Sequence, residues 1–391
     1  MINIQESRVG LSRSEQPESA MKRSFIFDGI LAGLLLLNGC VAGQRAVTAP
    51  NPQTTLKDAF KNDFLIGVAL TPRQFTEENQ AETALVKQQF NSITPENVMK
   101  WRLIHPESNR FDFSPADRYV EFGLKNNMVI IGHNLIWPER TPDWVFQDAQ
   151  GNPVDRDTLL ARMREHILTV VGRYKGKIRG WDVVNEALNN DGSPQRSPWF
   201  KILGEDYLLK AYQFAHEADP DMELYYNDYG LEKPAKRAGA IRLLKKLRKA
   251  GVEVSAIGLQ GHYGMTWAHP EQIDETIDDF ARLHLKVMIA ELDLDMLPHP
   301  GARAQLDSYP NGIPDGVQER ITHRYVQVFK IFLKHRAQIS RVTFWGVDDG
   351  DSWLNNWPIK GRTSYPLLFD RSCQPKPALA AIVKMAEEGK R

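Results

Sequence analysis

Two glutamates stand directly after short apolar segments, and their residue type suits the cleavage of a glycosidic bond. Glu186 follows Ile178–Val184 and Asn185, and Glu291 follows Val287–Ala290. In such cleavage one carboxylic acid protonates the leaving oxygen, while a second carboxylate attacks or stabilises the anomeric carbon. In a retaining enzyme the two groups stand about 5–5.5 Å apart across the sugar. We therefore expect Glu186 to be the acid, with a pKa raised by partial burial and nearby negative charge.

Other polar and aromatic side chains follow apolar segments in the same way. They are Glu96, Asn97, Lys100, His133, Trp137, Asn185, Tyr229, Gln260, His262, Trp345 and Trp353. Amides and imidazoles can bond sugar hydroxyls, and indole faces can pack on sugar rings. A structural core would carry apolar residues at most of these places, so their convergence predicts a functional site. Three further acids, Asp182, Asp228 and Asp293, are interpreted as supports for these side chains.

Eight candidate strands position these residues, and helical patterns separate them. The strands are Phe64–Leu70, Phe90–Thr94, Met128–Leu135, Ile178–Val184, Glu223–Asn227, Ala256–Gln260, Val287–Ala290 and Arg341–Trp345. Alternation of this kind predicts a parallel sheet, and at this length an α/β fold consisting of one closed (β/α)8 TIM barrel. Its active site would lie at the carboxyl ends of the strands. A doubly wound open sheet is the alternative, but its glycine fingerprint after the first strand is missing.

The segment Pro234–Ala250 illustrates the helical pattern. Its apolar residues fall on one face: Ala240, Leu243, Leu244 and Leu247. Pro234 opens the helix and Gly251 closes it. We expect its many Lys and Arg side chains to face solvent.

Composition excludes several classes of function. The 391 residues include 49 Lys+Arg and 49 Asp+Glu, so no net field favours nucleic acid or an anionic membrane. The sequence contains no zinc-type cysteine or histidine spacing and no phosphate-binding glycine loop, so we expect no metal and no other cofactor. Cys373 has no assignable role.

The beginning of the chain resembles an export signal. Met21-Lys22-Arg23 is followed by an apolar run from Gly29 to Leu37, which is too short to span a bilayer. Leu37-Asn38-Gly39-Cys40 resembles a bacterial lipobox, in which Cys40 would be lipidated. We therefore expect a leader over residues 1–40, with translation starting at Met1 or Met21, a tether over 41–55 and a catalytic domain over 56–391. An outer-membrane lipoprotein facing the periplasm or the cell surface is expected, with a periplasmic or secreted protein as the alternative.

Four motifs together resemble glycoside hydrolase family 10, the xylanase family, from about residue 60 to Leu379. They are Thr94-Pro95-Glu96-Asn97-x-Met99-Lys100-Trp101, Trp181-Asp182-Val183-Val184-Asn185-Glu186, Glu291-Leu292-Asp293, and Pro366-Leu367-Leu368-Phe369-Asp370 with Pro375-Lys376-Pro377-Ala378. The resemblance implies a retaining endo-1,4-β-xylanase that acts on xylan and xylo-oligosaccharides, with Glu186 as acid/base and Glu291 as nucleophile. We expect a monomer that contacts a membrane only through Cys40.

The resemblance also implies roles for the binding residues. Glu96, Asn97 and Lys100 would bind sugars on the non-reducing side. Five residues would frame the cleaved xylose: His133, Trp137, Asn185, Gln260 and His262. Tyr229 would offer an aromatic face on the leaving side. Trp345 and Trp353 would cap the cleaved unit and crowd the hydroxymethyl group of glucose.

The sequence departs from the family pattern at three places. Pro138-Glu139-Arg140 stand where the family usually has His-x-Gln, Gly230 replaces a frequent Asn, and Gly261 replaces a usual Ser. These departures affect the expected subsites. One hypothesis is that Arg140 pairs with the carboxylate of a glucuronic-acid branch, because guanidinium suits carboxylates.

Three other functions are compatible with a barrel. A cellulase or mixed-linkage glucanase would keep the chemistry, but the pair Trp345 and Trp353 argues against it. A non-catalytic glycan-binding lipoprotein would not need both glutamates. An aldolase or isomerase would need a Schiff-base lysine or a phosphate site, and neither is apparent.

Overall fold

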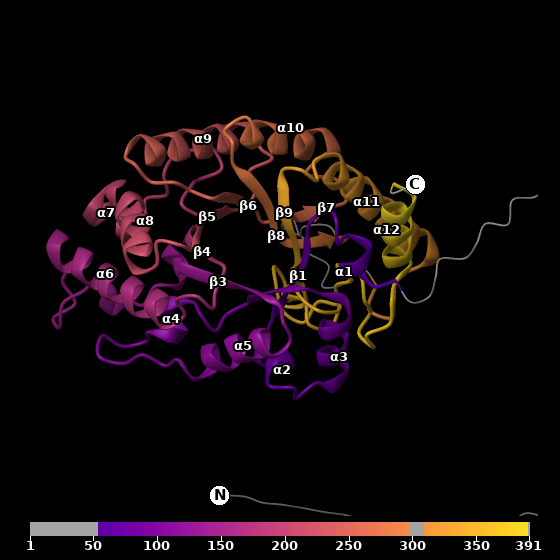
Figure 1. Cartoon of the computed structure of the whole chain (residues 1–391), viewed down its shortest axis with the longest axis horizontal. Coiled ribbons are helices and arrows are strands. Elements are labelled where there is room, and N and C mark those ends of the chain that lie inside the picture. Colours follow the sequence, from indigo (N-terminus) through magenta and orange to yellow (C-terminus); the bar gives the residue numbers. More distant parts are fainter. Residues whose placement is uncertain (1–53, 298–308, 390–391) are drawn as a thin grey trace, which may run out of the picture. The chain divides into compact units, whose positions relative to one another are not determined.

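The described residues, 54–297 and 309–389 of this computed structural model, form a barrel of parallel strands surrounded by helices (Figure 1). The strands of the barrel are β1 Leu65–Leu70, β2 Ser92–Pro95, β3 Val129–Ile136, β4 Gly180–Asn185, β5 Glu223–Asp228, β6 Ala256–Leu259, β8 Lys286–Asp295 and β9 Ile339–Phe344. Each pairs in parallel with its neighbours, and pairing of β6 with β8 closes the ring. The predicted (β/α)8 barrel is therefore confirmed, and the open-sheet alternative is wrong.

One strand was not predicted from the sequence. The short β7, His262–Gly264, lies beside the carboxyl-terminal extension of β8 and pairs His262 with Asp293. Its three residues are too few to show a pattern of their own. Together with the extension of β8, β7 adds parallel pairing beyond the barrel, at the end where the predicted site residues lie.

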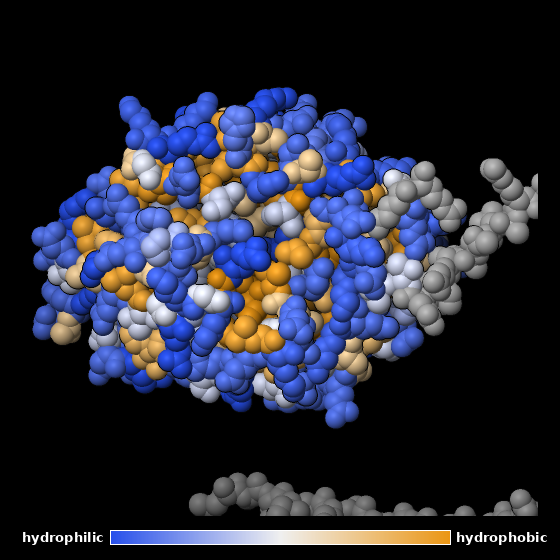
Figure 2. All heavy atoms as spheres, viewed as in Figure 1, coloured by the Kyte–Doolittle hydropathy of each residue, from blue (hydrophilic) through white to orange (hydrophobic). Residues whose placement is uncertain are grey.

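Helices connect successive strands and cover the outside of the barrel. The long ones are α3 Gln80–Gln89, α5 Ser114–Lys125, α6 Arg156–Arg173, α8 Asp206–Ala218, α9 Pro234–Lys249, α10 Pro270–Ala281, α11 Asp315–Lys334 and α12 Pro377–Glu388. Shorter helices are α1 Leu56–Ala59, α2 Pro72–Phe75, α4 Trp101–Ile104 and α7 Pro198–Leu203. Hydrophilic residues cover most of the face shown in Figure 2, and hydrophobic ones gather near its middle. None of the described helices is long and apolar enough to cross a membrane.

Helix α9 agrees with its sequence pattern in part. Pro234 occupies its first turn, the predicted apolar face is buried, and Gly251 follows the helix with φ +80°. The expectation that its basic side chains face solvent is wrong for two of them, because Lys236 is 0% exposed and Arg237 8%. The first turn lies beside the carboxyl end of β5, where Lys236 pairs with buried Asp228.

Some predictions fall on the undescribed beginning of the chain. The leader of residues 1–40 and the lipidation site Cys40 lie outside the described residues, as does the tether up to residue 53. Thr55, at the end of the predicted tether, caps helix α1 by accepting a hydrogen bond from the backbone N–H of Asp58. Export, anchoring and the monomeric state stay predictions from the sequence.

Close packing between β3 and β4 gives a test of the barrel interior. Gly132 is paired with Trp181, and a Cβ at Gly132 would lie 2.2 Å from the indole ring. We expect Gly132→Ala to lower the free energy of unfolding by about 2 kcal/mol, in the range known for overpacked cores. Urea denaturation would measure it. Gly172→Ala is the control, because a Cβ in that helical position meets nothing within 4 Å. A destabilisation of both variants to the same degree would contradict the proposed clash.

Candidate active site

The carboxyl ends of the strands bring the predicted site residues together. Glu186 follows β4, Glu291 lies within β8, and Asn227 of β5 contacts residues from both strands. The same end carries His133 and Trp137 from β3, Glu96 from β2, Gln260 after β6, and Trp345 and Trp353 after β9. Register shifts interrupt the pairing of β3 with β4, β4 with β5, and β8 with β9 near these residues. The regular barrel therefore gives way to irregular backbone where the polar side chains begin.

Glu186 is held by neutral donors. Its Oε1 accepts hydrogen bonds from the Gln260 amide at 2.8 Å and the Asn185 amide at 3.2 Å, and its Oε2 accepts one from the Trp137 indole N–H at 3.1 Å. Its backbone has φ +57°, a conformation that is uncommon for a non-glycine residue. Burial raises the pKa of Glu186 to about 7, and the negative charges of Asp228 and Glu291 add to the rise. The raised pKa expected for Glu186 is thus confirmed in direction and in cause.

Glu291 is held by stronger donors. Asn227 donates its amide N–H to Oε1 at 2.7 Å, and Nε2 of His262 lies 3.2 Å from Oε2. Burial alone would raise the pKa of Glu291. The hydrogen bond from His262 and the positive charges around the carboxylate outweigh burial, so the pKa lies below its usual value. Near neutral pH, one carboxyl group of this pair is therefore ionised while Glu186 retains a proton for part of the time.

A chain of contacts fixes the imidazole beside Glu291. Nδ1 of His262 lies 3.0 Å from Asp293, and the same carboxylate oxygen accepts the indole N–H of Trp353 at 2.8 Å. Burial would lower the pKa of His262, but Asp293 and Glu291 raise it to about 10. His262 is then an imidazolium at neutral pH, and its two N–H groups point at two carboxylates.

A second histidine is supported in the same way. Nδ1 of buried His133 lies 2.8 Å from Asp182. The ring of Trp345 packs edge-on against His133, with centroids 5.4 Å apart, and lies 6.4 Å from His262. The interpretation of Asp182 and Asp293 as supports therefore agrees with their contacts, since each orients a histidine of the site.

The residues that follow β2 form a hydrogen-bonded series that reaches Trp137 through Lys100. Lys100 is 7% exposed and donates to Asn97 Oδ1 at 2.9 Å, while Asn97 donates to Glu96 at 3.0 Å. Nζ of Lys100 lies 4.9 Å from the centre of the Trp137 ring. Because it is buried, Lys100 is not a solvent-facing side chain at the start of helix α4. Lys100 instead places a positive charge inside the mouth, which helps to lower the pKa of Glu291.

The departures from the family pattern have definite structures. Pro138–Arg140 forms a single 3-10 turn, η1, and the exposed guanidinium of Arg140 lies 5.0 Å from the centre of the Trp137 ring. Gly230 and Gly261 have φ of +61° and +80°, which favour glycine. Tyr229 precedes Gly230 and is 38% exposed at the rim.

Two contributors to the mouth were missed from the sequence. Asn227 donates to both Asn185 and Glu291, and Lys236 pairs with Asp228. The signal for Asn227 was its place at the end of β5, beside Asp228. Nothing in the periodicity of α9 distinguishes Lys236 from its solvent-facing neighbours.

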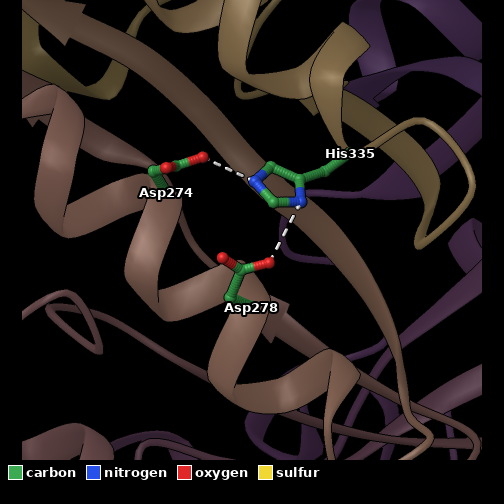
Figure 3. Close-up of side chains that lie close together, drawn as sticks. All are labelled: Asp274, Asp278 and His335. Atoms are coloured by element: carbon green, nitrogen blue, oxygen red, sulfur yellow. Dashed lines mark hydrogen bonds and ion pairs between the residues drawn. The ribbon is translucent and has the colours of Figure 1, made fainter.

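A separate cluster of Asp274, Asp278 and His335 lies between α10 and the end of α11 (Figure 3). Nε2 of His335 contacts Asp274 at 2.6 Å, and its Nδ1 faces Asp278 at 3.7 Å. Each of the two ring nitrogens is thus paired with a different carboxylate. Lys334 also binds both oxygens of Asp274 at 2.7 Å. The cluster is therefore explained as ion pairing between two helices.

The pKa of Glu186 makes stability depend on pH. The pKa in the fold, about 7, lies above its ordinary value of 4.5, so the folded state holds the proton more tightly and loses stability as pH rises between these values. Glu186→Gln removes that loss. We therefore compare the melting temperature of Glu186→Gln with that of the unaltered protein at two pH values. The difference, variant minus unaltered protein, should be larger at pH 8 than at pH 5. An equal difference at both pH values would contradict the raised pKa.

Comparison with known proteins agrees with this arrangement. Residues 55–385 match the family model described as glycosyl hydrolase family 10. The chain is 42% identical over 354 residues to endo-1,4-beta-xylanase A of Xylanibacter ruminicola. The matched region covers 88% of this chain and 96% of that protein. It is 43% identical over 333 residues to beta-1,4-xylanase of Dictyoglomus thermophilum, covering 84% of this chain and 90% of that protein.

Solved structures lead to the same family. An endoxylanase of the family retrieved from a sugarcane soil metagenome superposes with a TM-score of 0.82 at 43% identity, covering 85% of this chain and 99% of that one. Xylanase XynB of Paenibacillus barcinonensis has a TM-score of 0.79 at 37% identity, covering 84% and 98%. The chain belongs to glycosyl hydrolase family 10.

Proposed function

We propose that this protein is an endo-1,4-β-xylanase that hydrolyses internal bonds of xylan with retention of anomeric configuration. The observation that carries the proposal is the pair Glu186 and Glu291, which lie at one barrel mouth and have pKa values shifted in opposite directions. Relatives more than 40% identical over most of the chain are named as xylanases. A glycan-binding protein without catalysis would not need this division of charge.

We assign the two glutamates different roles in a double displacement, because their pKa values are shifted in opposite directions. In the first step, the Glu291 carboxylate attacks the anomeric carbon while Glu186 gives its proton to the leaving glycosidic oxygen. The products are a free aglycone and a sugar ester on Glu291. In the second step, Glu186 takes a proton from water, which attacks the anomeric carbon and releases Glu291. Two inversions give net retention.

The remaining residues bind and select the sugar. We propose that His133, Trp137, Asn185, Gln260 and His262 surround the cleaved xylose, and that Glu96, Asn97 and Lys100 bind the neighbouring unit. Trp345 and Trp353 lie against the two histidines and are fixed by them. We expect indoles at these positions to crowd the hydroxymethyl group of glucose. Selection of xylan over cellulose follows from that crowding.

Product analysis tests the function. The purified full-length protein is incubated with glucuronoxylan, carboxymethyl-cellulose and barley β-glucan, and the released sugars are separated. We expect a ladder of xylo-oligosaccharides from xylan and little from either glucan. Preferred release from the glucans would show that the tryptophans do not select xylose, and no release from any polymer would favour a binding protein.

Two variants serve as controls for the assigned roles. Glu291→Gln should abolish activity on every substrate, because the nucleophile is lost. Glu186→Gln should abolish cleavage of xylan but leave the first step on an aryl xylobioside, whose leaving group needs little protonation. It should also remove the alkaline limb of the pH profile, expected near pH 7. An alkaline limb unchanged in that variant would rule Glu186 out as the acid.

We also propose that Arg140 binds an acidic branch of the substrate. Its guanidinium is exposed at the rim and lies over the Trp137 ring, 5.0 Å from its centre. Stacking on an indole orients the planar group while leaving its N–H edge open to a carboxylate. Lys100, which lies over the same ring, is buried and so is not available to the branch.

A comparison of two substrates tests this role. We expect Arg140→Ala to lower kcat/KM on glucuronidated xylan, relative to unbranched xylan, by about 1.4- to five-fold, since an exposed ion pair contributes roughly 0.2–1 kcal/mol. The difference should shrink at high salt. Arg179→Ala is the matched control, because Arg179 precedes β4 at the opposite end of the barrel. An unchanged ratio for Arg140→Ala would exclude the branch contact.

A further inference from the structure

Lys236 is a fully buried lysine in contact with two groups of the mouth. It lies in the first turn of α9, with a side chain that is 0% exposed. Its Nζ stands 2.8 Å from Oδ1 of Asp228 and 3.4 Å from the centre of the Tyr229 ring. A cation over an aromatic face is attracted to the ring, and more strongly where water is excluded. Lys236 therefore joins the rim tyrosine to a buried carboxylate.

Tyr229 depends on few contacts for its orientation. Its backbone N–H donates to Oδ1 of Asp228 at 2.9 Å, and Lys236 lies against its ring. The ring is 38% exposed, so solvent reaches part of it. An ammonium on one face leaves the opposite face available to a sugar. Burial of Lys236 also makes that arrangement rigid, because a buried charge that leaves its partner is strongly penalised.

Asp228 links the same lysine to Glu186. The carboxylate is 0% exposed and accepts hydrogen bonds from the Tyr226 hydroxyl at 2.6 Å and from the backbone of Tyr229. Burial raises the pKa of Asp228, and the charge of Lys236 opposes that rise. When ionised, Asp228 in turn helps to raise the pKa of Glu186.

We propose that Lys236 is a positioning residue for the leaving-group side of the reaction. It holds the ring of Tyr229 against the departing sugar and keeps the negative charge of Asp228 beside the acid. Lys236 itself is buried behind both groups and does not touch substrate. This role rests on the proposed xylanase function and gives a reason for a fully buried lysine in the first turn of an otherwise amphipathic helix.

Substrates with different leaving groups test the proposal. A xylo-oligosaccharide places a sugar at Tyr229 and needs the acid, whereas an aryl β-xylobioside needs neither. We expect Lys236→Met, which keeps the length of the side chain, to lower kcat/KM on the oligosaccharide about three- to thirty-fold more than on the aryl substrate, the range for loss of a cation–π contact. The alkaline limb of its pH profile should also move to lower pH, because neutral Asp228 no longer raises the pKa of Glu186.

Two comparisons separate positioning from folding. Lys376→Met removes another buried ion pair, in which Nζ lies 2.9 Å from Asp349 and the side chain is 7% exposed. Lys376→Met should lower the melting temperature without changing the ratio of kcat/KM on the xylo-oligosaccharide to kcat/KM on the aryl xylobioside.

A second comparison uses Tyr229. The single change Tyr229→Leu should lower that ratio of kcat/KM values, and adding Tyr229→Leu to Lys236→Met should have little further effect on it. Equal losses on both substrates in Lys236→Met, or additive effects of the two changes, would overturn the proposal. Failure of the xylanase function is distinguishable, since the unaltered protein would then cleave neither substrate.

Discussion

Two carboxyl groups buried in one barrel mouth must hold their protons with different strength, and the arrangement of the mouth follows from that constraint. Like charges at close range are not both ionised without a large penalty. The donors are divided accordingly. Glu291 receives the imidazolium of His262 and the amide of Asn227, which stabilise the ion, whereas Glu186 receives only the neutral donors of Gln260, Asn185 and Trp137.

A second layer of side chains holds these donors in place. His262 is fixed by Asp293, which Trp353 holds in turn, and His133 is fixed by Asp182. Burying charges is costly unless each has a partner, and here the partners come from different strands. The parallel barrel therefore acts as the rigid frame that keeps the pairs in place, and loss of one support would be felt at the carboxylates.

The sequence predicted the barrel, its eight strands and the residues at their ends, because apolar runs and strand-end chemistry are local properties. It did not predict β7, whose three residues are defined by pairing with β8. The role of Asn227 also depends on the approach of β4, which pairs with β5, and of β8, which lies beyond β6 in the ring. Lys236 was assigned to the solvent because helical periodicity describes faces, and its burial arises from the end of the neighbouring strand.

The same electrostatic coupling can move Glu186 from acid to base within one catalytic cycle. In the free enzyme, the negative charge of Glu291 contributes to the raised pKa of Glu186. Formation of the sugar ester removes that charge, so the pKa of Glu186 must fall after the first step. A group that began as a proton donor then becomes an ionised base when water enters. An ionised Asp228, paired with Lys236, is consumed in neither step, so its negative charge limits that fall and helps Glu186 to accept a proton from water.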